Sequence, residues 1–290
     1  MSSQPGWTAY EYYPSMGAAV VFILLFAIVT LMHTFHLFRT RTWFFIPLMI
    51  GGYFELVGYI GRAMSSKESP DWTIGPYVMQ STLLLIAPAL FAASIYMELG
   101  RVIVMIKGEQ FALIRVNWMT KIFVAGDVLS FLMQASGAGI MVTGSSSTDP
   151  SSSVSTGQNV IIGGLIVQIV FFGFFLISAV IFQKRMGSHS KGRRAVADQY
   201  PWHKHMWALQ SSSTLVLVRS VIRVVEYAQG THGYLMEHEV FIYVFDGLLM
   251  FAVMAIFMII HPSEVNYILG RGKVVTAMGG LKVMEGSNAV

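Results

Sequence analysis

The feature that most constrains this chain is a series of seven long apolar stretches. Each is close to the length of about 20 residues that a helix needs to cross the hydrocarbon core of a bilayer. An α-helix satisfies its own backbone polar groups, so it is the element that such stretches form in lipid. The stretches lie near 17–38, 44–63, 76–99, 119–142, 160–183, 205–228 and 239–261. The sequence therefore predicts an all-α, polytopic membrane protein with a bundle of seven transmembrane helices.

The predicted domain organisation is simple. The transmembrane domain covers 17–265, a short N-terminal tail covers 1–16, and a C-terminal tail covers 266–290. Hydrophobic residues make up 54% of the 290 residues and charged residues 12%, whereas a soluble domain carries about 25% charge. We therefore expect an integral membrane protein with no room for a soluble domain.

Several functional classes are excluded or disfavoured by composition. The chain has no cysteine, which excludes a disulfide scaffold, a thiolate metal site and a cysteine nucleophile. It has no P-loop and no basic run interleaved with aromatic residues, so we expect neither direct ATP-driven pumping nor a nucleic-acid partner. We also expect no cofactor.

The distribution of Lys and Arg predicts the orientation of the chain. One face of the predicted bundle carries fourteen of these residues, and the other carries two, Arg62 and Lys67, in a predicted 62–75 loop. We therefore expect the N-terminus outside and the C-terminus in the cytosol. The polar, serine-rich run 144–157 is typical of a loop, and this count places it outside.

Ionisable residues inside the spans are the main functional signal, because a charge in the bilayer core is costly and is kept for a reason. Arg219, Arg223 and Glu226 stand at i, i+4 and i+7, which places them on one helix face directed to the bundle interior. Six such residues fall well inside the spans: Glu55, Asp127, Arg219, Arg223, Glu226 and Asp246.

Depth along the spans predicts partners for the two arginines. Arg223 is expected to meet Glu55 or Asp246, and Arg219 lies nearer the level of Gln134. Four acids face two arginines, so full ionisation would leave a charge of −2 in low dielectric. Either some acids hold protons or a cationic group completes the site; the structural alternative for each residue is an ion-pair network that fixes helix packing.

Pro88 lies in the middle of the third span, where it removes a backbone hydrogen bond and bends the helix. The sequence leaves open whether this is a static kink, or a hinge or cavity wall. With the six charged residues, we take as candidate substrate-binding residues Gln134, Pro88, Tyr96 and Glu98.

Three histidines fall near the predicted cytosolic ends of their spans. His33, His36 and His261, with Glu98, have the composition of a zinc site in a metal-dependent lipid hydrolase. Histidines spaced i, i+3 at a helix end are more often interfacial or hydrogen-bonded to their neighbours. We therefore expect no metal and no enzymatic activity, and keep these residues as the alternative.

The order of motifs along the chain resembles that of the fungal RTA-like family of seven-span membrane proteins, also called the lipid-translocating exporter family. The matching segments are GGYFELVGYIGR (51–62), APALFAASIYMELGR (87–101), DVLSFLMQ (127–134), and the stretch from Arg219 to His261-Pro262. The resemblance covers about 10–265 and implies a seven-helix protein of the plasma membrane. Members are linked to translocation of sphingoid long-chain bases, to resistance against an aminosterol and other toxic amphiphiles, and to porphyrin uptake.

The resemblance and the excess of acids together favour a translocator of amphiphilic, cationic lipids. We expect a polar intramembrane cavity in which Glu55, Asp127 or Asp246 binds the amine and Arg219 and Arg223 hold the acids. The partners would be membrane lipids and the amphiphile. Two alternatives stay open: a receptor or sensor for a lipid or porphyrin, and the metal-dependent hydrolase. The sequence leaves the oligomeric state open.

Overall fold

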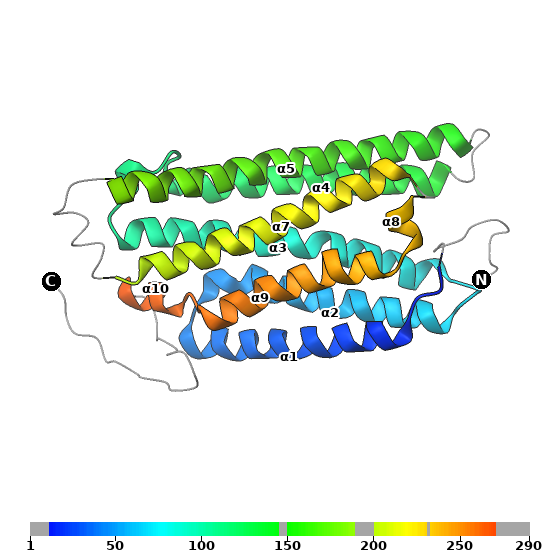
Figure 1. Ribbon diagram of the computed structural model, residues 1–290, viewed down its shortest axis with the longest axis horizontal. Coiled ribbons are helices and arrows are strands. Elements are labelled where there is room, and N and C mark those ends of the chain that lie inside the picture. Colours follow the sequence, from blue (N-terminus) through cyan, green and yellow to red (C-terminus); the bar gives the residue numbers. More distant parts are fainter. Residues whose placement is uncertain (1–11, 145–149, 189–199, 231–232, 271–290) are drawn as a thin grey trace.

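The structure is a computed structural model that describes residues 12–144, 150–188, 200–230 and 233–270. Within these ranges the chain is helical and contains no strand (Figure 1). The long helices are α1 (Met16–Thr40), α2 (Ile46–Lys67), α3 (Ile74–Met105), α4 (Val116–Gly144), α5 (Pro150–Ser188), α7 (Trp202–Gln229) and α9 (Leu249–Ile259). The short elements are η1 (Trp43–Phe45), η2 (Glu109–Phe111), α8 (Tyr234–Glu237), the π-helical η3 (Ile242–Leu248) and α10 (Ser263–Ile268).

Seven segments of the described chain are long and apolar enough to cross a membrane, the last formed by η3, α9 and α10 together. This confirms the predicted all-α bundle of seven spanning helices and the integral membrane class. Large apolar side chains are also exposed along the length of the bundle, as lipid contact requires. On α1 these are Val20, Val21, Leu24, Ile28, Leu31, Phe35 and Phe38.

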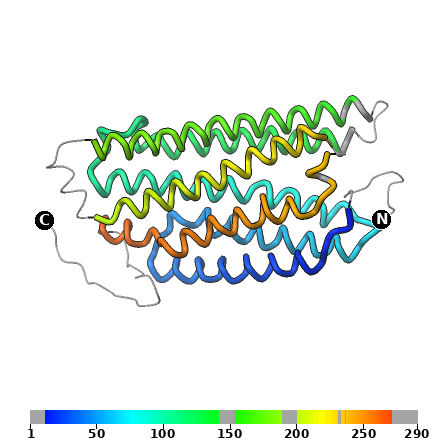
Figure 2. The backbone as a smooth tube through the Cα atoms, in the orientation of Figure 1, coloured from blue at the N-terminus to red at the C-terminus, as the bar shows by residue number. Residues whose placement is uncertain are grey.

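The helices form two groups with a shared middle. Figures 1 and 2 show α4 and α5 together along one side, α1, α2 and α9 along the other, and α3 and α7 between them. We call the end where α1 begins the N-side and the end where α10 lies the C-side. The N-side is the predicted outer end of the bundle, and that orientation stays a prediction.

The α4–α5 pair is packed through glycines. A Cβ atom at Gly137 would lie 2.6 Å from the main-chain oxygen of Gly157, and one at Gly157 would meet the oxygen of Gly137 at the same distance. In lipid, helices associate through such close approaches of small residues. The prediction of a loop over 144–157 is therefore wrong from Pro150 onward, where α5 begins. Residues 145–149 lie outside the described ranges.

Two features explain why a serine-rich segment is helical here. Proline is favoured at the first position of a helix, where its missing N–H is not needed, and Pro150 occupies that position in α5. The close backbone contact at Gly157 then fixes the segment against α4. Composition alone carries neither signal.

The seventh span is interrupted, whereas the sequence predicts one helix over 239–261. Its first part, η3, is π-helical, and the helix breaks after Ile259 before α10 begins at Ser263. A π-helical turn rotates the residues that follow it and is frequent at functional sites. Of the predicted 266–290 tail, the first residues belong to α10, and 271–290 are outside the described part of the chain.

The Gly137 contact gives a stability test. Replacement of Gly137 by Ala should destabilise the purified protein by about 1–3 kcal/mol, because the new methyl group meets backbone atoms that cannot rotate away. Thermal unfolding in detergent would measure the effect. Gly139→Ala is the matched control, since nothing lies within 4 Å of a Cβ atom there. Equal shifts in the two variants would contradict the packing argument.

Candidate intramembrane binding site

The site begins with a carbonyl group that Pro88 frees. Proline has no N–H, so the carbonyl four residues before it, that of Leu84, loses its helical hydrogen bond. Arg219 on α7 donates from Nη2 to the Leu84 oxygen at 2.8 Å. The side chain of Arg219 is only 1% exposed, so an acceptor at this depth is required. The proline of α3 thereby helps to anchor an arginine of α7.

The other partner of Arg219 comes from the seventh span. Its Nε donates to Oδ1 of Asp246, a residue of the π-helical η3. Arg223 lies 3.6 Å from the second oxygen of Asp246 and donates to both oxygens of Glu226 at 3.1 and 3.2 Å. Asp246 was one of the two partners expected for Arg223. Two arginines and two carboxylates therefore balance in charge.

Glu55 of α2 lies beside these four residues but lacks the hydrogen bonds that they make. Its electrostatic neighbours are Asp246, Arg219 and Arg223. It is fully buried, and neither carboxylate oxygen accepts a hydrogen bond from any described residue. We call Glu55, Arg219, Arg223, Glu226 and Asp246 the central charge cluster. Its net charge is −1 when Glu55 is ionised, so Glu55 is the acid of this cluster that the described part of the chain leaves without a partner.

Aromatic rings lie next to the central charge cluster. Tyr59, one helical turn from Glu55, is fully buried and stacks on Phe22 and Phe26, with ring centroids 5.1 and 5.6 Å apart. The Tyr59 hydroxyl has no hydrogen-bond partner among the described residues. It points at Gly247, where a Cβ atom would lie too close to the hydroxyl oxygen to be accommodated. The absence of a side chain at Gly247 therefore leaves room for the Tyr59 hydroxyl beside the cluster.

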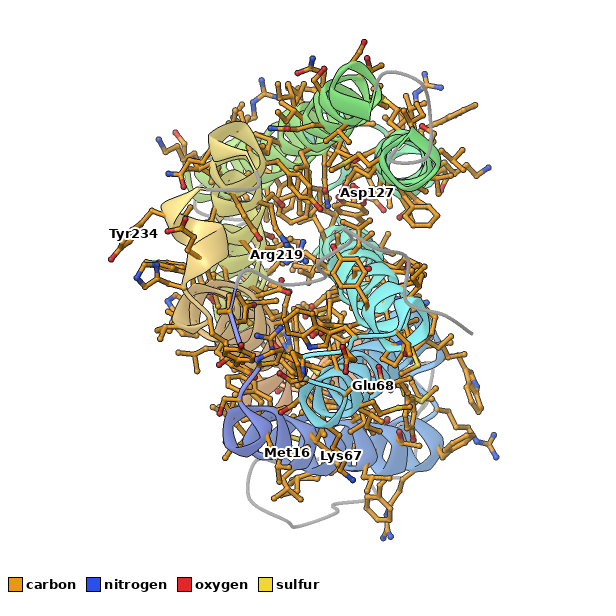
Figure 3. All side chains as sticks on the ribbon, turned by 90° about the vertical axis from the view of Figure 1, so that its right-hand side faces the viewer. Met16, Lys67, Glu68, Asp127, Arg219 and Tyr234 are labelled. Atoms are coloured by element: carbon orange, nitrogen blue, oxygen red, sulfur yellow. The ribbon has the colours of Figure 1, made fainter. Side chains whose placement is uncertain are left out.

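Asp127 and Gln134 belong to a second polar group, whereas the sequence analysis placed them with the arginines. Tyr96 donates to Asp127 at 2.9 Å. Gln134 donates to Ser130 at 2.7 Å, and the hydrogen bonds of Arg219 go to Leu84 and Asp246, so no described hydrogen bond joins Arg219 to Gln134. Figure 3 looks along the bundle from the N-side. It shows Arg219 near the middle and Asp127, a residue of α4, on the side of the α4–α5 pair. Asp127 therefore joins α4 to α3, whereas Ser130 and Gln134 bond across the contact between α4 and α5.

A third polar group closes the N-side end. Arg62 is fully buried in α2 and bonds Glu239 at 2.8 Å, Tyr243 at 2.9 Å and Tyr12 at 2.9 Å. The assignment of Arg62 to a 62–75 loop was therefore wrong, because α2 continues to Lys67. Burial raises the pKa of the Tyr12 hydroxyl, with Arg62 acting in the opposite direction, so Tyr12 stays a neutral acceptor. This group ties the N-terminal segment to the start of the seventh span.

The fourth polar group lies near the C-side end. Glu98 of α3 and His205 of α7 are both fully buried, with 3.4 Å between Oε1 and Nδ1. The other ring nitrogen of His205 lies 3.1 Å from Glu264 of α10, which also pairs with Lys204 at 2.5 Å. We call Glu98, His205 and Glu264 the C-side triad. Only Glu98 of the three was a candidate from the sequence.

A seven-residue spacing in the sequence indicates that His205 belongs to the polar face of α7. His205, Ser212, Arg219 and Glu226 recur at intervals of seven residues on α7, which keeps them near one face of the helix. His205 lies at the predicted end of the span, so the sequence predicted this face only from Arg219 onward. Glu239 and Tyr243 carry no comparable signal, since they act through contacts with α2.

The candidate metal ligands do not converge. The rings of His36 and His261 are 5.4 Å apart and those of His33 and His261 are 6.3 Å apart, but Glu98 pairs with His205 instead. Within the described ranges, no three His, Cys, Asp or Glu side chains are arranged to hold a metal ion. The geometry therefore gives no support to the zinc hydrolase alternative.

Together these observations define a polytopic membrane protein of seven spanning helices with buried charges in its interior. Residues 48–267 match the family described as RTA1 like protein, and the chain belongs to this RTA1-like family. The resemblance drawn from the sequence motifs is confirmed. No solved structure gives a significant match.

Named relatives cover most of the chain. It is 35% identical to Protein RTM1 of Saccharomyces cerevisiae, over 89% of this chain and 93% of that protein. It is 37% identical to Protoporphyrin uptake protein 1 of the same species, over 88% and 92%. It is 25% identical to Sphingoid long-chain base transporter RSB1, also of Saccharomyces cerevisiae, over 86% and 72%.

The Arg219–Asp246 pair gives a second test. Arg219→Met or Asp246→Leu alone should destabilise the protein by about 3–5 kcal/mol, because each leaves a buried charge without its partner. The double variant should lose much less than the sum, since both charges leave together. Unfolding of the four proteins in mixed detergent micelles would measure this coupling. Strictly additive losses would show that the two side chains do not depend on each other.

Proposed function

We propose that this protein moves amphiphilic molecules with a cationic headgroup across the membrane, and that Glu55 of the central charge cluster binds the headgroup. Sphingoid long-chain bases are the substrate class we favour. The observation that carries the proposal is the carboxylate of Glu55, fully buried and without a hydrogen-bond partner among the described residues. Such a group needs either a proton or a cation.

The charge of the cluster favours an amine. With Arg219 and Arg223 already balanced by Asp246 and Glu226, one added positive charge at Glu55 makes the cluster neutral. An ammonium group also offers several N–H donors. The nearby Tyr59 supplies a hydroxyl acceptor and an aromatic ring, and both suit a desolvated cation.

An apolar groove supports a place for the hydrocarbon tail. It lies between α1 and α9, encloses about 240 Å³, and is lined by Leu25, Ile28, Val29, Met32, Phe251, Ala255, Met258 and Ile259. Phe251 at its wall contacts Phe26, with 6.2 Å between ring centroids, and Phe26 stacks on Tyr59. A chain of aromatic contacts therefore leads from the groove to the surroundings of Glu55.

The names of two relatives support a role in membrane transport. One is named for transport of sphingoid long-chain bases and another for uptake of protoporphyrin. We favour the amine over the porphyrin because Glu55, the residue of the central charge cluster to which the described residues donate no hydrogen bond, is an acid. We also propose that the protein acts in the plasma membrane as a non-enzymatic translocator, with its N-side outside.

Asp127 stays in the proposal as a secondary binding residue. Its Oδ1 accepts no hydrogen bond from the described residues, while Tyr96 occupies the other oxygen. Pro88 acts indirectly, through the Leu84 carbonyl that positions Arg219. Gln134 and Glu98 lie in the other polar groups, so we assign them no direct headgroup contact.

Flux of a fluorescent sphingoid base in proteoliposomes tests the proposal. Wild-type protein should raise flux above that of empty liposomes, and Glu55→Gln should lower it by about tenfold or more, because it removes the charge that pairs with the amine. Glu237→Gln, an exposed acid in α8, should leave flux unchanged.

Each variant is compared only when it is monodisperse and unfolds at a temperature near that of wild type. Wild-type flux with an unaffected Glu55→Gln variant would overturn the assignment of Glu55. No wild-type flux, together with saturable binding of the base, would favour the receptor alternative over a translocator.

A further inference from the structure

The C-side triad has no part in the proposed headgroup binding. It connects a buried acid, Glu98, to the protein surface through His205 and Glu264. His205 lies between Glu98, at 3.4 Å from Nδ1, and Glu264, at 3.1 Å from Nε2. Glu98 and His205 are 0% exposed, whereas the side chain of Glu264 is 28% exposed. The three groups form a line from solvent to the interior.

Glu98 is not held as a structural anion. Neither of its oxygens accepts a hydrogen bond from a described residue, and the 3.4 Å approach of His205 is longer than a well-formed hydrogen bond. A structural carboxylate at this depth would be expected to have several donors. The surroundings of Glu98 instead suit a carboxyl group that exchanges a proton with the imidazole of His205.

We propose that Glu98, His205 and Glu264 form a proton-exchange site that carries protons between the C-side surface and the bundle interior. The transfer starts with His205 neutral and protonated at Nδ1. A proton bound at Glu264 moves to Nε2 as the Glu264 O–H bond breaks. The resulting imidazolium releases its Nδ1 proton to Glu98, where an O–H bond forms. Rotation of the neutral ring, or exchange with water, restores the first tautomer.

The surrounding charges bear on this exchange. On α7, Lys204 pairs with Glu264; on α3, Arg101 bonds Asn266 of α10 at 2.9 Å. The buried His261 is an electrostatic neighbour of His205, and it lies in turn beside His33 and His36 of α1. Among the described residues, the charged group in contact with Glu98 is His205.

The site also faces the central charge cluster along one seam. Glu98 lies opposite His205 and Leu84 lies opposite Arg219, so α3 and α7 run antiparallel in constant register. Fourteen residues separate the two contacts on each helix, which is about 21 Å along the helix axis. Between them, the hydroxyls of Ser212 and Ser213 are buried and have no partner among the described residues.

The seam leads from the C-side triad to the central charge cluster, which is where the proton would be used. Buried hydroxyls with free hydrogen-bonding capacity can hold bridging waters, which would be needed to cover such a distance. The use of the proton rests on the proposed function: release of an ammonium headgroup from Glu55 would be completed by protonation of the same carboxylate. Proton exchange at Glu98 itself does not require that function.

Infrared difference spectroscopy of the full chain in lipid, after a pH jump and without substrate, tests the site directly. Wild-type protein should show carbonyl stretches of buried, protonated carboxyl groups that appear on acidification, and Glu98→Gln should lose one band that Glu55→Gln keeps. His205→Gln should keep the band but slow its appearance by about tenfold or more, since it removes the general acid–base group.

Glu109→Gln is the matched control, because Glu109 is an exposed acid in η2 at the same end of the bundle. It should leave the band and its rate unchanged. A spectrum from which Glu98→Gln removes no band, or an unchanged rate in His205→Gln, would overturn the proposal. Since no substrate is present, a failure here is separate from a failure of the flux assay with Glu55→Gln.

Discussion

The missing hydrogen bond at Pro88 is the constraint on which the interior of this bundle depends. It exposes the Leu84 carbonyl in the interior of the bundle, and Arg219 binds that oxygen. Arg219 in turn fixes Asp246, and Asp246 approaches Arg223, which binds Glu226. One break in the backbone ladder of α3 therefore organises charged side chains from two other spans, α7 and the seventh span.

Close packing and buried charge perform different tasks in the two halves of the bundle. Lipid gives helices little hydrophobic reason to associate, so small residues and polar contacts hold them together. The α4–α5 pair relies on the glycine contact between Gly137 and Gly157. The helices around α3 and α7 instead share ionic and hydrogen-bonded groups at several depths.

The sequence predicted the seven spans and most of the buried charges because both depend on local composition. It did not predict how those charges divide among groups, since Asp127 pairs with Tyr96 and Glu98 with His205 through tertiary contacts. Arg62 was assigned to a loop because a charge near the end of an apolar stretch is usually exposed. Its burial depends on Glu239, which lies far away in the sequence.

The excess of acid in the interior has a different meaning once the groups are separated. Counted together, the acids exceed the arginines by two; in the structure, one unbalanced carboxylate, Glu55, stands at the central charge cluster and another, Asp127, stands with Tyr96. Glu98 adds a third buried acid, about 21 Å from the Leu84 level along α3. A bundle that only needed rigid packing would neutralise each of these with a nearby donor. Glu55 and Glu98 accept no hydrogen bond from the described residues, and Asp127 has one oxygen without a donor; this pattern fits the proposed exchange of protons and a cationic headgroup.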